Sequence, residues 1–329
     1  MTFMSRSFAA LAALGLSAGL AAAEPAIIFD LGGKFDKSFN ESAFRGAQRW
    51  AEKTGGEFNE IELSSEAQRE QALRRFAQRG ANPVVMTGFA FGSVLEEVAP
   101  DFPDTKFVII DAVVDLPNVQ SVVFREDQGS FLVGVLAAMA SETGTVGFVG
   151  GMDIPLIRKF ACGYVQGVKH QSPGTEVIQN MTGTTPAAWN DPVKGGELAK
   201  AQISQGADVV YAAAGGTGIG VLQAVADAGK LGIGVDSNQN YLHPGNMLTS
   251  MVKRVDVAVE KAFTAGAEAE PGIQVLGLAN NGVDYAVDEN NEDLLTDEMI
   301  ARVEEVKDAI IADELKVHDY TADSTCPVG

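Results

Sequence analysis

Aspartate residues close several short apolar runs of this sequence. Asp30, Asp111 and Asp236 each follow a run that is typical of a buried strand, and Gly88 closes a fourth run of the same kind. The carboxyl ends of parallel strands form the edge at which open α/β sheets bind ligands. A carboxylate there can accept hydrogen bonds from hydroxyl or ring N–H groups. One such aspartate is more often a turn former or a helix cap, but three at similar places favour a binding site.

The stretch 26–46 predicts a strand, a glycine turn and a helix in succession. Ser38 would cap the helix, and Glu41 three residues later would complete a capping box. An aromatic ring beside polar groups beyond the end of a strand suits a flat ligand with polar edges. The residues expected there are Asp36, Ser38, Phe39 and Asn40. The alternative, equally good on position alone, is that Phe39 belongs to the core and Ser38 is only a cap.

Two further places carry residues that could contact a ligand. Lys253 and Arg254 follow an expected strand at 248–252. They form either a surface pair or, if Lys253 lies near Asp236, a donor and charge partner for that carboxylate. Trp189 directly precedes an expected helix and is either a core residue or a stacking wall. The polar residues that follow it favour the wall.

The glycine turn at 216–220 resembles a dinucleotide-binding fingerprint, because it follows a strand, opens a helix and precedes Asp236 by about 20 residues. Its spacing is G-x-G-x-G rather than G-x-G-x-x-G, and it lies far from the first strand–helix unit of the chain. The first 23 residues also have the pattern of a signal peptide, and an exported protein would rarely meet NAD. We therefore interpret these glycines as a tight turn whose backbone can approach a ligand.

Few residues suggest catalysis. The three histidines are far apart in the sequence and predict no metal site. Neither a nucleophile elbow nor a phosphate-binding loop is present. The many carboxylates leave an acid/base pair open, although solvated surface charge is the commoner explanation.

Strands and helices alternate along the chain with short connections, which predicts doubly wound parallel sheets of the α/β class. A second series begins near residue 145 and repeats the layout of the first, with a strand, the glycine pair Gly150–Gly151 and a helix. Two such series suggest two lobes that close around a ligand. We expect each lobe to be discontinuous, with residues 24–124 plus 251–283 in one and 125–250 plus 284–329 in the other.

The 329 residues carry a net charge of −20, which argues against a nucleic-acid or anionic-membrane partner, since both require basic patches. Residues 1–23 have the pattern of a signal peptide, with Arg6, a short apolar run and small residues before a cleavage point after Ala23. This pattern predicts an exported, periplasmic protein. Because no cysteine lies at the cleavage point, we expect that it is not a lipoprotein.

The sequence contains two cysteines, Cys162 in an expected helix and Cys326 near the C-terminus. In an oxidising compartment they could form a disulfide that holds the C-terminus. The alternative is two free thiols, one of them buried. Export favours the disulfide slightly.

Five segments, in order along nearly the whole mature chain, resemble the basic membrane protein family, the substrate-binding proteins of ABC transporters related to purine nucleoside receptor A. They are D-K-S-F-N at 36–40, G-G-M-D-I-P at 150–155, A-A-G-G-T-G at 213–218, G-V-D at 234–236 and T-S-M-V-K-R-V-D at 249–256. The resemblance implies the type I periplasmic binding protein fold, with two lobes joined by a hinge. Many members are lipoproteins, whereas this chain lacks the lipid-accepting cysteine.

The resemblance also implies roles for individual residues. Phe39 would stack on one face of a purine, Asp111 would accept hydrogen bonds from the base edge, and Asp236 and Lys253 would hold the ribose hydroxyls. Trp189 is the candidate for the opposing wall. The full set expected at the ligand comprises Asp30, Asp36, Ser38, Phe39, Asn40, Gly88, Phe89, Asp111, Trp189, Gly215, Asp236 and Lys253.

These observations predict a monomeric, non-enzymatic binding protein that captures a purine nucleoside or purine base and presents it to an ABC permease in the inner membrane. No cofactor is implied. Riboflavin is the alternative ligand. The alternative functions are an exported nucleoside-processing enzyme that uses one of the site aspartates and a ligand-sensing module that signals through a partner.

Overall fold

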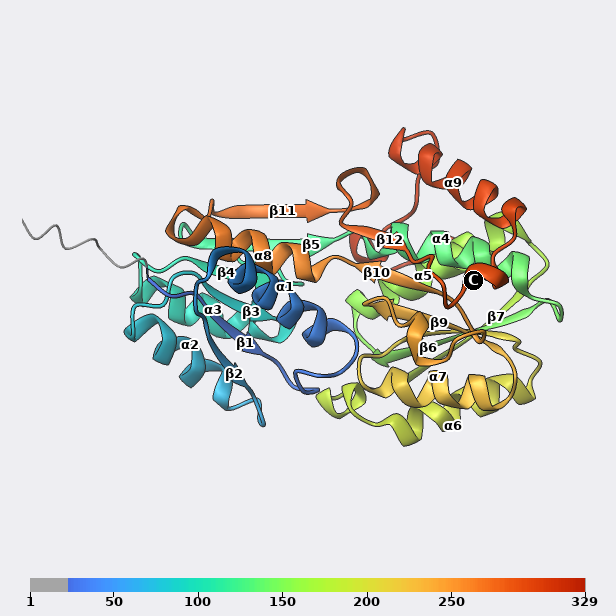
Figure 1. Cartoon of the computed structure of the whole chain (residues 1–329), viewed down its shortest axis with the longest axis horizontal. Coiled ribbons are helices and arrows are strands. Elements are labelled where there is room, and N and C mark those ends of the chain that lie inside the picture. The colour runs from blue at the N-terminus through green and yellow to red at the C-terminus, as the bar shows by residue number, and fades with distance from the viewer. Residues whose placement is uncertain (1–22, 329) are drawn as a thin grey trace, which may run out of the picture.

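The computed structural model describes residues 23–328 and places two α/β lobes at opposite ends of the long axis of the molecule (Figure 1). The predicted signal peptide lies almost entirely outside the described residues. Within residues 23–328, no helix is long and apolar enough to cross a membrane.

The first lobe is built on a parallel six-stranded sheet in the order β11-β5-β4-β3-β1-β2. Its central strands β1, β3 and β4 are buried at every position, which explains why their sequences are continuously apolar. The strands are β1 (Ala26–Phe29), β2 (Asn59–Glu62), β3 (Val84–Thr87), β4 (Phe107–Ile110), β5 (Val119–Phe124) and β11 (Gly272–Leu276).

Four helices accompany this sheet: α1 (Phe39–Thr54), α2 (Gln68–Gln78), α3 (Gly92–Val98) and α8 (Val255–Ala265). Side chains of α2 and α3 pack with Ile28 and Met86 in one apolar cluster, whereas those of α1 and α8 pack with Ile27 and Val85 in another. Neighbouring strand residues point to opposite faces, so helices cover both faces of the sheet.

The second lobe has a six-stranded sheet in the order β12-β10-β9-β8-β6-β7, parallel except for the edge strand β12. Its strands are β6 (Thr145–Met152), β7 (Glu176–Gly183), β8 (Val209–Ala213), β9 (Leu231–Asp236), β10 (Met247–Lys253) and β12 (Val283–Tyr285). Its helices are α4 (Glu126–Ala140), α5 (Pro155–Gln171), α6 (Pro192–Ser204), α7 (Thr217–Asp227) and α9 (Asp297–Ile311).

Short 3₁₀ helices occupy several connections. They are η1 (Phe89–Phe91), η2 (Ala99–Asp101), η3 (Pro186–Trp189), η4 (Asn240–Leu242), η5 (Gly266–Glu268), η6 (Leu278–Asn280), η7 (Glu292–Leu294) and η8 (Tyr320–Ala322).

The chain crosses between the lobes three times, and these crossings form the hinge. The first crossing joins β5 to α4 around Arg125, the second joins β10 to α8 around Arg254, and the third is the segment 277–282 between β11 and β12. Backbone hydrogen bonds join the crossings to their neighbours, from Arg125 N–H to Leu276 O and from Arg254 N–H to Gly282 O. Each lobe is therefore discontinuous in sequence.

The predicted fold class is confirmed, and most predicted elements lie within a few residues of their positions in the structure. The expected return of the chain to the first lobe at residue 251 falls inside β10, which ends at Lys253. Strand β12 has no counterpart among the predicted elements. The pair Gly150–Gly151 was expected to end a strand, but β6 continues through it to Met152.

The predicted capping box at α1 is wrong. Ser38 stands at the N-cap position, but its side chain makes no capping hydrogen bond. Asp36 caps the helix instead, because its carboxylate accepts hydrogen bonds from the backbone N–H groups of Ser38, Asn40 and Glu41. This arrangement leaves the hydroxyl of Ser38 available for a contact with the other lobe.

Candidate ligand-binding cleft

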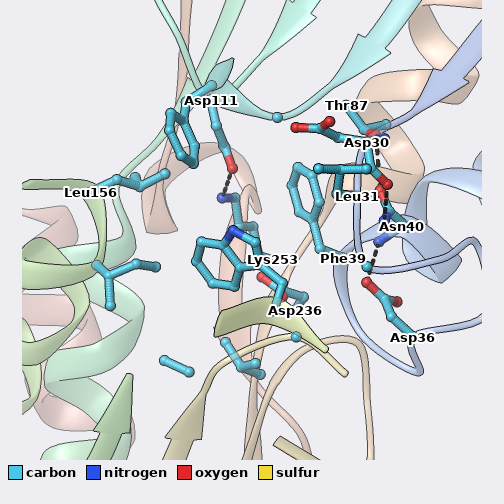
Figure 2. A pocket seen from close by; sticks show the side chains of 18 of the residues that line it. Asp30, Leu31, Asp36, Phe39, Asn40, Thr87, Asp111, Leu156, Asp236 and Lys253 are labelled. Atoms are coloured by element: carbon cyan, nitrogen blue, oxygen red, sulfur yellow. Dashed lines mark hydrogen bonds and ion pairs between the residues drawn. The ribbon is translucent and has the colours of Figure 1, made fainter. Parts of the chain in front are cut away.

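A cavity with an empty volume of about 680 Å³, part of it open to solvent, lies between the two lobes. Its lining comes from both lobes and includes every residue of the expected ligand set except Ser38. Figure 2 shows Asp30, Asp111 and Asp236 reaching it from different strands.

Four strands that end at the cavity are each followed or terminated by a residue with positive φ. Gly88 after β3 has φ 112°, Asp111 after β4 has φ 72°, Gly215 near the end of β8 has φ 56° and Asp236 at the end of β9 has φ 62°. Aspartate is one of the few side-chain-bearing residue types that enters this region readily. Each lobe thus contributes one glycine and one aspartate in the left-handed conformation to the same cavity.

The carboxylate of Asp111 forms a buried ion pair with Lys253, with 2.7 Å between Oδ2 and Nζ (Figure 2). Burial raises the pKa of Asp111 to about 6, although the charge of Lys253 lowers it. The second oxygen, Oδ1, is buried and has no hydrogen-bond partner among the described residues. A buried carboxylate oxygen without a donor is costly, so this atom is a ready acceptor for a ligand N–H or O–H group.

The side chain of Lys253 is 1% exposed, and its ammonium is surrounded by two carboxylates and three phenylalanine rings. It is 2.9 Å from Glu126 Oε1 as well as 2.7 Å from Asp111. The ring centroids of Phe39, Phe124 and Phe160 are 4.9–5.5 Å away. Burial lowers the pKa of Lys253, but the neighbouring carboxylates outweigh burial and raise it above its ordinary value. Lys253 is therefore a buried cation and not half of an exposed pair with Arg254.

Asp236 is held by the opposite lobe. Ser38 donates its hydroxyl to Asp236 Oδ2 at 2.6 Å, and the hydroxyl of Ser237 donates to Ser38 O at 2.9 Å. Gln239 Nε2 also donates to Lys37 O at 3.0 Å. Burial raises the pKa of Asp236 above its ordinary value, while Lys253 and Ser38 lower it. The structure is thus a closed arrangement in which loop 36–38 contacts the end of β9.

Two aromatic residues line the cavity from different lobes. Phe39 is the first residue of α1 in the first lobe, and Trp189 ends η3 in the second. A side chain at Gly151 would collide with the indole of Trp189, since its Cβ would lie 2.1 Å from the ring. The glycine within β6 therefore makes room for Trp189 at the cavity wall. Both rings remain partly accessible.

Asp30 and Asn40 also line the cavity, but their polar atoms are engaged within the first lobe. Arg69 of α2 binds Asp30 through two hydrogen bonds of 3.0 and 3.2 Å. The amide of Asn40 donates to Asp30 O and Gly33 O and accepts the hydroxyl of Thr87 at 2.8 Å. These two residues therefore shape the cavity wall, and their polar atoms are less available for hydrogen bonds with a ligand.

The glycine turn at 216–220 serves packing of the second lobe. A Cβ at Gly220 would lie 1.8 Å from Pro192 O, so this glycine allows α7 to approach α6. Gly215 lines the cavity, whereas Gly216, Gly218 and Gly220 do not. The turn is therefore a close contact between helices, and only Gly215, the residue directly before it, lies at the cavity.

Several lining residues could not be selected from the sequence. Leu156, Ile157 and Phe160 of α5 form an apolar part of the wall, and Leu31 and Thr87 add to it from the first lobe. The repeated strand–glycine–helix layout was the available signal for α5, because it places the start of that helix at the same edge of its sheet as the start of α1.

A disulfide joins Cys162 of α5 to Cys326 of the C-terminal tail. Among residues 23–328, no cluster of three or more histidine, cysteine, aspartate or glutamate side chains is arranged to hold a metal ion.

Comparison with known proteins gives one consistent result. Residues 24–321 match the family model described as ABC transporter substrate-binding protein PnrA-like. A nucleoside-binding protein of an ABC transporter from Lactococcus lactis, BmpA, is 32% identical over 80% of this chain and 81% of its own. The crystal structure of an ABC transporter solute-binding protein from Aeropyrum pernix has a TM-score of 0.83 and 31% identity, and covers 90% of this chain and 93% of its own.

The predicted location is contradicted by these comparisons. An uncharacterized lipoprotein of Pyrococcus abyssi is 37% identical over 79% of this chain and 68% of its own, and matches from two further Pyrococcus species carry the same description. These relatives are described as lipoproteins, which contradicts the expectation that this chain is not one. The prediction rested on the lack of a cysteine at the expected cleavage point, and that lack does not exclude a lipoprotein.

Proposed function

The chain belongs to the family of PnrA-like ABC transporter substrate-binding proteins, and from this premise we propose that it captures a purine nucleoside or purine base in the interlobe cleft and delivers it to a membrane permease. The nucleoside-binding description of the Lactococcus relative supports this choice of ligand. Membership of a solute-binding family favours binding without chemical conversion.

The observation that carries the proposal is the buried, unpaired Oδ1 of Asp111 at the cavity. A purine edge supplies a ring N–H or an exocyclic amine that would satisfy this oxygen. A wrong ligand would leave it unpaired, and a site built around a buried acceptor rejects such ligands strongly. Asp111 would therefore select the base.

Phe39 and Trp189 would hold the faces of the base, one from each lobe. Stacking of a base on an aromatic side chain contributes roughly 1–3 kcal/mol. Because the rings belong to different lobes, a base held by both would favour the closed arrangement over an open one.

Asp236 and Lys253 would hold the ribose hydroxyls. Asp236 Oδ2 accepts one hydrogen bond from Ser38 and its carboxylate retains further acceptor capacity. The ammonium of Lys253 contacts two carboxylates and, with three N–H donors, keeps one for a ligand oxygen. We further propose that the protein acts as a monomer whose lobes close about the three-stranded hinge.

The test is a thermal-shift and calorimetric screen of residues 24–329, unfolded and refolded to remove any carried ligand. The panel contains adenosine, guanosine, inosine, uridine, adenine, riboflavin and ribose. A ligand at 100 times its Kd stabilises the fold by about 2.7 kcal/mol. We expect shifts with purine nucleosides, none with ribose, and recovery of unchanged ligand by mass spectrometry.

Two variants connect the result to the cleft. Phe39→Ala should weaken binding about 5- to 150-fold, as loss of a stacking contact of roughly 1–3 kcal/mol implies, without unfolding the protein. Phe44→Ala on the same helix is the control, because Phe44 contacts Phe29 and Phe35 and does not line the cleft. Binding of riboflavin alone, conversion of the nucleoside, or wild-type affinity in Phe39→Ala would contradict the proposal.

A further inference from the structure

A row of charges of alternating sign leads from the cleft through the hinge to the C-terminal tail. Asp111 binds Lys253, Lys253 binds Glu126, Glu126 binds Lys159, and Lys159 binds Asp319. The first pair belongs to the proposed ligand site. Glu126, Lys159 and Asp319 lie outside the cavity lining, and the family motifs of the sequence do not include them.

Glu126 is the centre of this row. It is 1% exposed, with Oε1 2.9 Å from Lys253 Nζ and Oε2 3.1 Å from Lys159 Nζ. Burial raises the pKa of Glu126, but the two ammonium groups outweigh burial and lower it. A buried carboxylate shared by two cations responds to the loss of either one, because the remaining cation then attracts it alone.

Lys159 connects Glu126 to the tail and to the hinge. Its ammonium donates to Phe124 O, the last residue of β5 before the first crossing, at 2.7 Å. It is also 3.2 Å from Asp319 Oδ2 and 3.9 Å from Asp127 Oδ1. The surroundings of Lys159 therefore include carboxylates from α4 and from the tail.

The tail is fixed on α5 beside Lys159. The disulfide between Cys162 and Cys326 attaches its end. Gln166, one helical turn after Cys162, exchanges two hydrogen bonds with the backbone of His318, of 2.9 and 3.0 Å. Asp319 is the next residue, so these bonds hold its carboxylate at Lys159.

We propose that Glu126 and Lys159 are positioning residues for the ligand site, and that the disulfide-bonded tail sets ligand affinity through them. With Asp319 in place, Lys159 divides its charge between the tail and Glu126, and Glu126 shares Lys253 with Asp111. Without Asp319, Lys159 draws Glu126 away from Lys253. Lys253 then binds Asp111 more tightly, and the carboxylate of Asp111 becomes a weaker acceptor for the ligand.

This inference rests on the proposed function, and the experiment is a double perturbation of the tail. Adenosine, guanosine and inosine are titrated calorimetrically into the wild type and Asp319→Asn, each with the disulfide intact and after reduction. We expect Asp319→Asn and reduction each to raise Kd about fivefold, within the range for residues that act at a distance. Glu126→Gln should raise it about tenfold or more.

The decisive readout is additivity. If the disulfide acts by holding Asp319, reduction adds almost nothing in Asp319→Asn, because coupled perturbations are not additive. A disulfide that only stabilises the fold would give independent, additive effects. The control is Asp323→Asn in the same tail, which should keep wild-type affinity because Asp323 contacts His318 and Thr325 and not Lys159.

Wild-type affinity in Asp319→Asn, or full additivity with reduction, would overturn the inference. If neither these three nucleosides nor adenine binds the wild type, the proposed function fails, and the coupling between the tail and Asp111 is then measured from the carboxyl ¹³C titration of Asp111, assigned with Asp111→Asn. A titration midpoint that moves in Asp319→Asn and not in Asp323→Asn supports the inference without any ligand. An unmoved midpoint contradicts it.

Discussion

Asp111 and Asp236 occupy equivalent places in the two lobes, and the difference between them shows how such a cleft is assembled. Both follow or end a buried strand, both have positive φ, and both reach the same cavity. Asp111 is held by Lys253, which is itself fixed at the hinge. Asp236 is held by the hydroxyl of Ser38 from the opposite lobe. The Asp111 half is therefore organised from the hinge, whereas the Asp236 half depends on closure.

The largest effect is expected from Lys253→Met, which would leave Asp111 and Glu126 buried without their shared cation. Removing one partner of a buried ion pair costs about 3–5 kcal/mol of unfolding free energy. Urea denaturation provides the measurement. Lys307→Met is the control, since the ion pair of Lys307 with Asp284 is partly exposed and should cost less than about 1 kcal/mol. Equal losses of unfolding free energy in the two variants would contradict the conclusion that the Asp111 half of the cleft is organised by the buried Lys253 at the hinge.

A smaller effect, on binding, is expected from removing the carboxylate of Asp236. Asp236→Ala should raise the nucleoside Kd about 30-fold, as expected for lost hydrogen bonds to a charged group. Asp236→Gly should bind as poorly as Asp236→Ala. Its free energy of unfolding should be about 1 kcal/mol higher than that of the alanine variant, because glycine accepts a φ of 62° without strain. Calorimetry and urea denaturation separate the two effects. A glycine variant less stable than the alanine variant would show that backbone strain is not concentrated at this strand end.

The contribution of Asp111 to stability should fall as pH rises, which is the opposite of the dependence expected for a carboxylate with a lowered pKa. Burial raises the pKa of Asp111 to about 6, so its contribution to stability is fully present below its ordinary pKa near 4 and is lost as pH rises through about 6. Relative to Asp111→Asn, the wild type should lose at most about 1.4 kcal/mol per pH unit in this interval.

Asp256 provides the opposite case for the same measurement. Although burial raises its pKa, the charges of Arg254 and Arg49 outweigh burial and lower it. Its contribution is therefore present above its ordinary pKa and lost as pH falls through the lowered value. Urea midpoints from pH 3 to pH 7 for Asp111→Asn and Asp256→Asn should differ from the wild type with opposite slopes. Slopes of the same sign would contradict the conclusion that the pKa of Asp111 is raised in the folded protein.

The smallest effect is expected from Ser38→Ala. The loss of one hydrogen bond to Asp236 should weaken nucleoside binding by about 1 kcal/mol, or about fivefold. Ser42→Ala in the first turn of α1 is the control, because the hydroxyl of Ser42 accepts a hydrogen bond from the backbone N–H of Asp256 within the first lobe. Equal affinities in the two variants would mean that the contact between lobes does not support Asp236.

The sequence predicts the strand ends of the cleft well and its ion pairs poorly. Apolar runs ended by Asp111 and Asp236 mark the edge of each sheet, and short connections fix which strands are neighbours. The other charged groups of the ion pairs at and behind the cleft come from distant segments. Arg69, Glu126 and Lys159 have no local pattern that separates them from surface charges, because their burial depends on how the helices pack.

Local signals also gave way to tertiary contacts at two points. The glycine pair at 150–151 looks like a strand end, but the indole of Trp189 covers Gly151 and β6 continues. Ser38 looks like a helix cap, but its hydroxyl binds Asp236 because Asp36 already satisfies the backbone N–H groups at the start of α1. For Gly151 the deciding contact comes from Trp189, more than 30 positions away. For Ser38 it comes from a competing local side chain, Asp36.

The three crossings of the hinge have a consequence for how the polypeptide acquires its structure. The first lobe, begun by β1 at residue 26, receives α8, one of its four covering helices, and its edge strand β11 only from residues 255–276. Most of the second lobe lies between them in the chain. A nascent chain that ends before residue 276 therefore cannot complete even its N-terminal half. The first lobe can therefore complete its sheet only after most of the second lobe has been synthesised. Its edge strand β11 must then close a long loop onto β5, and non-local contacts of this kind slow folding.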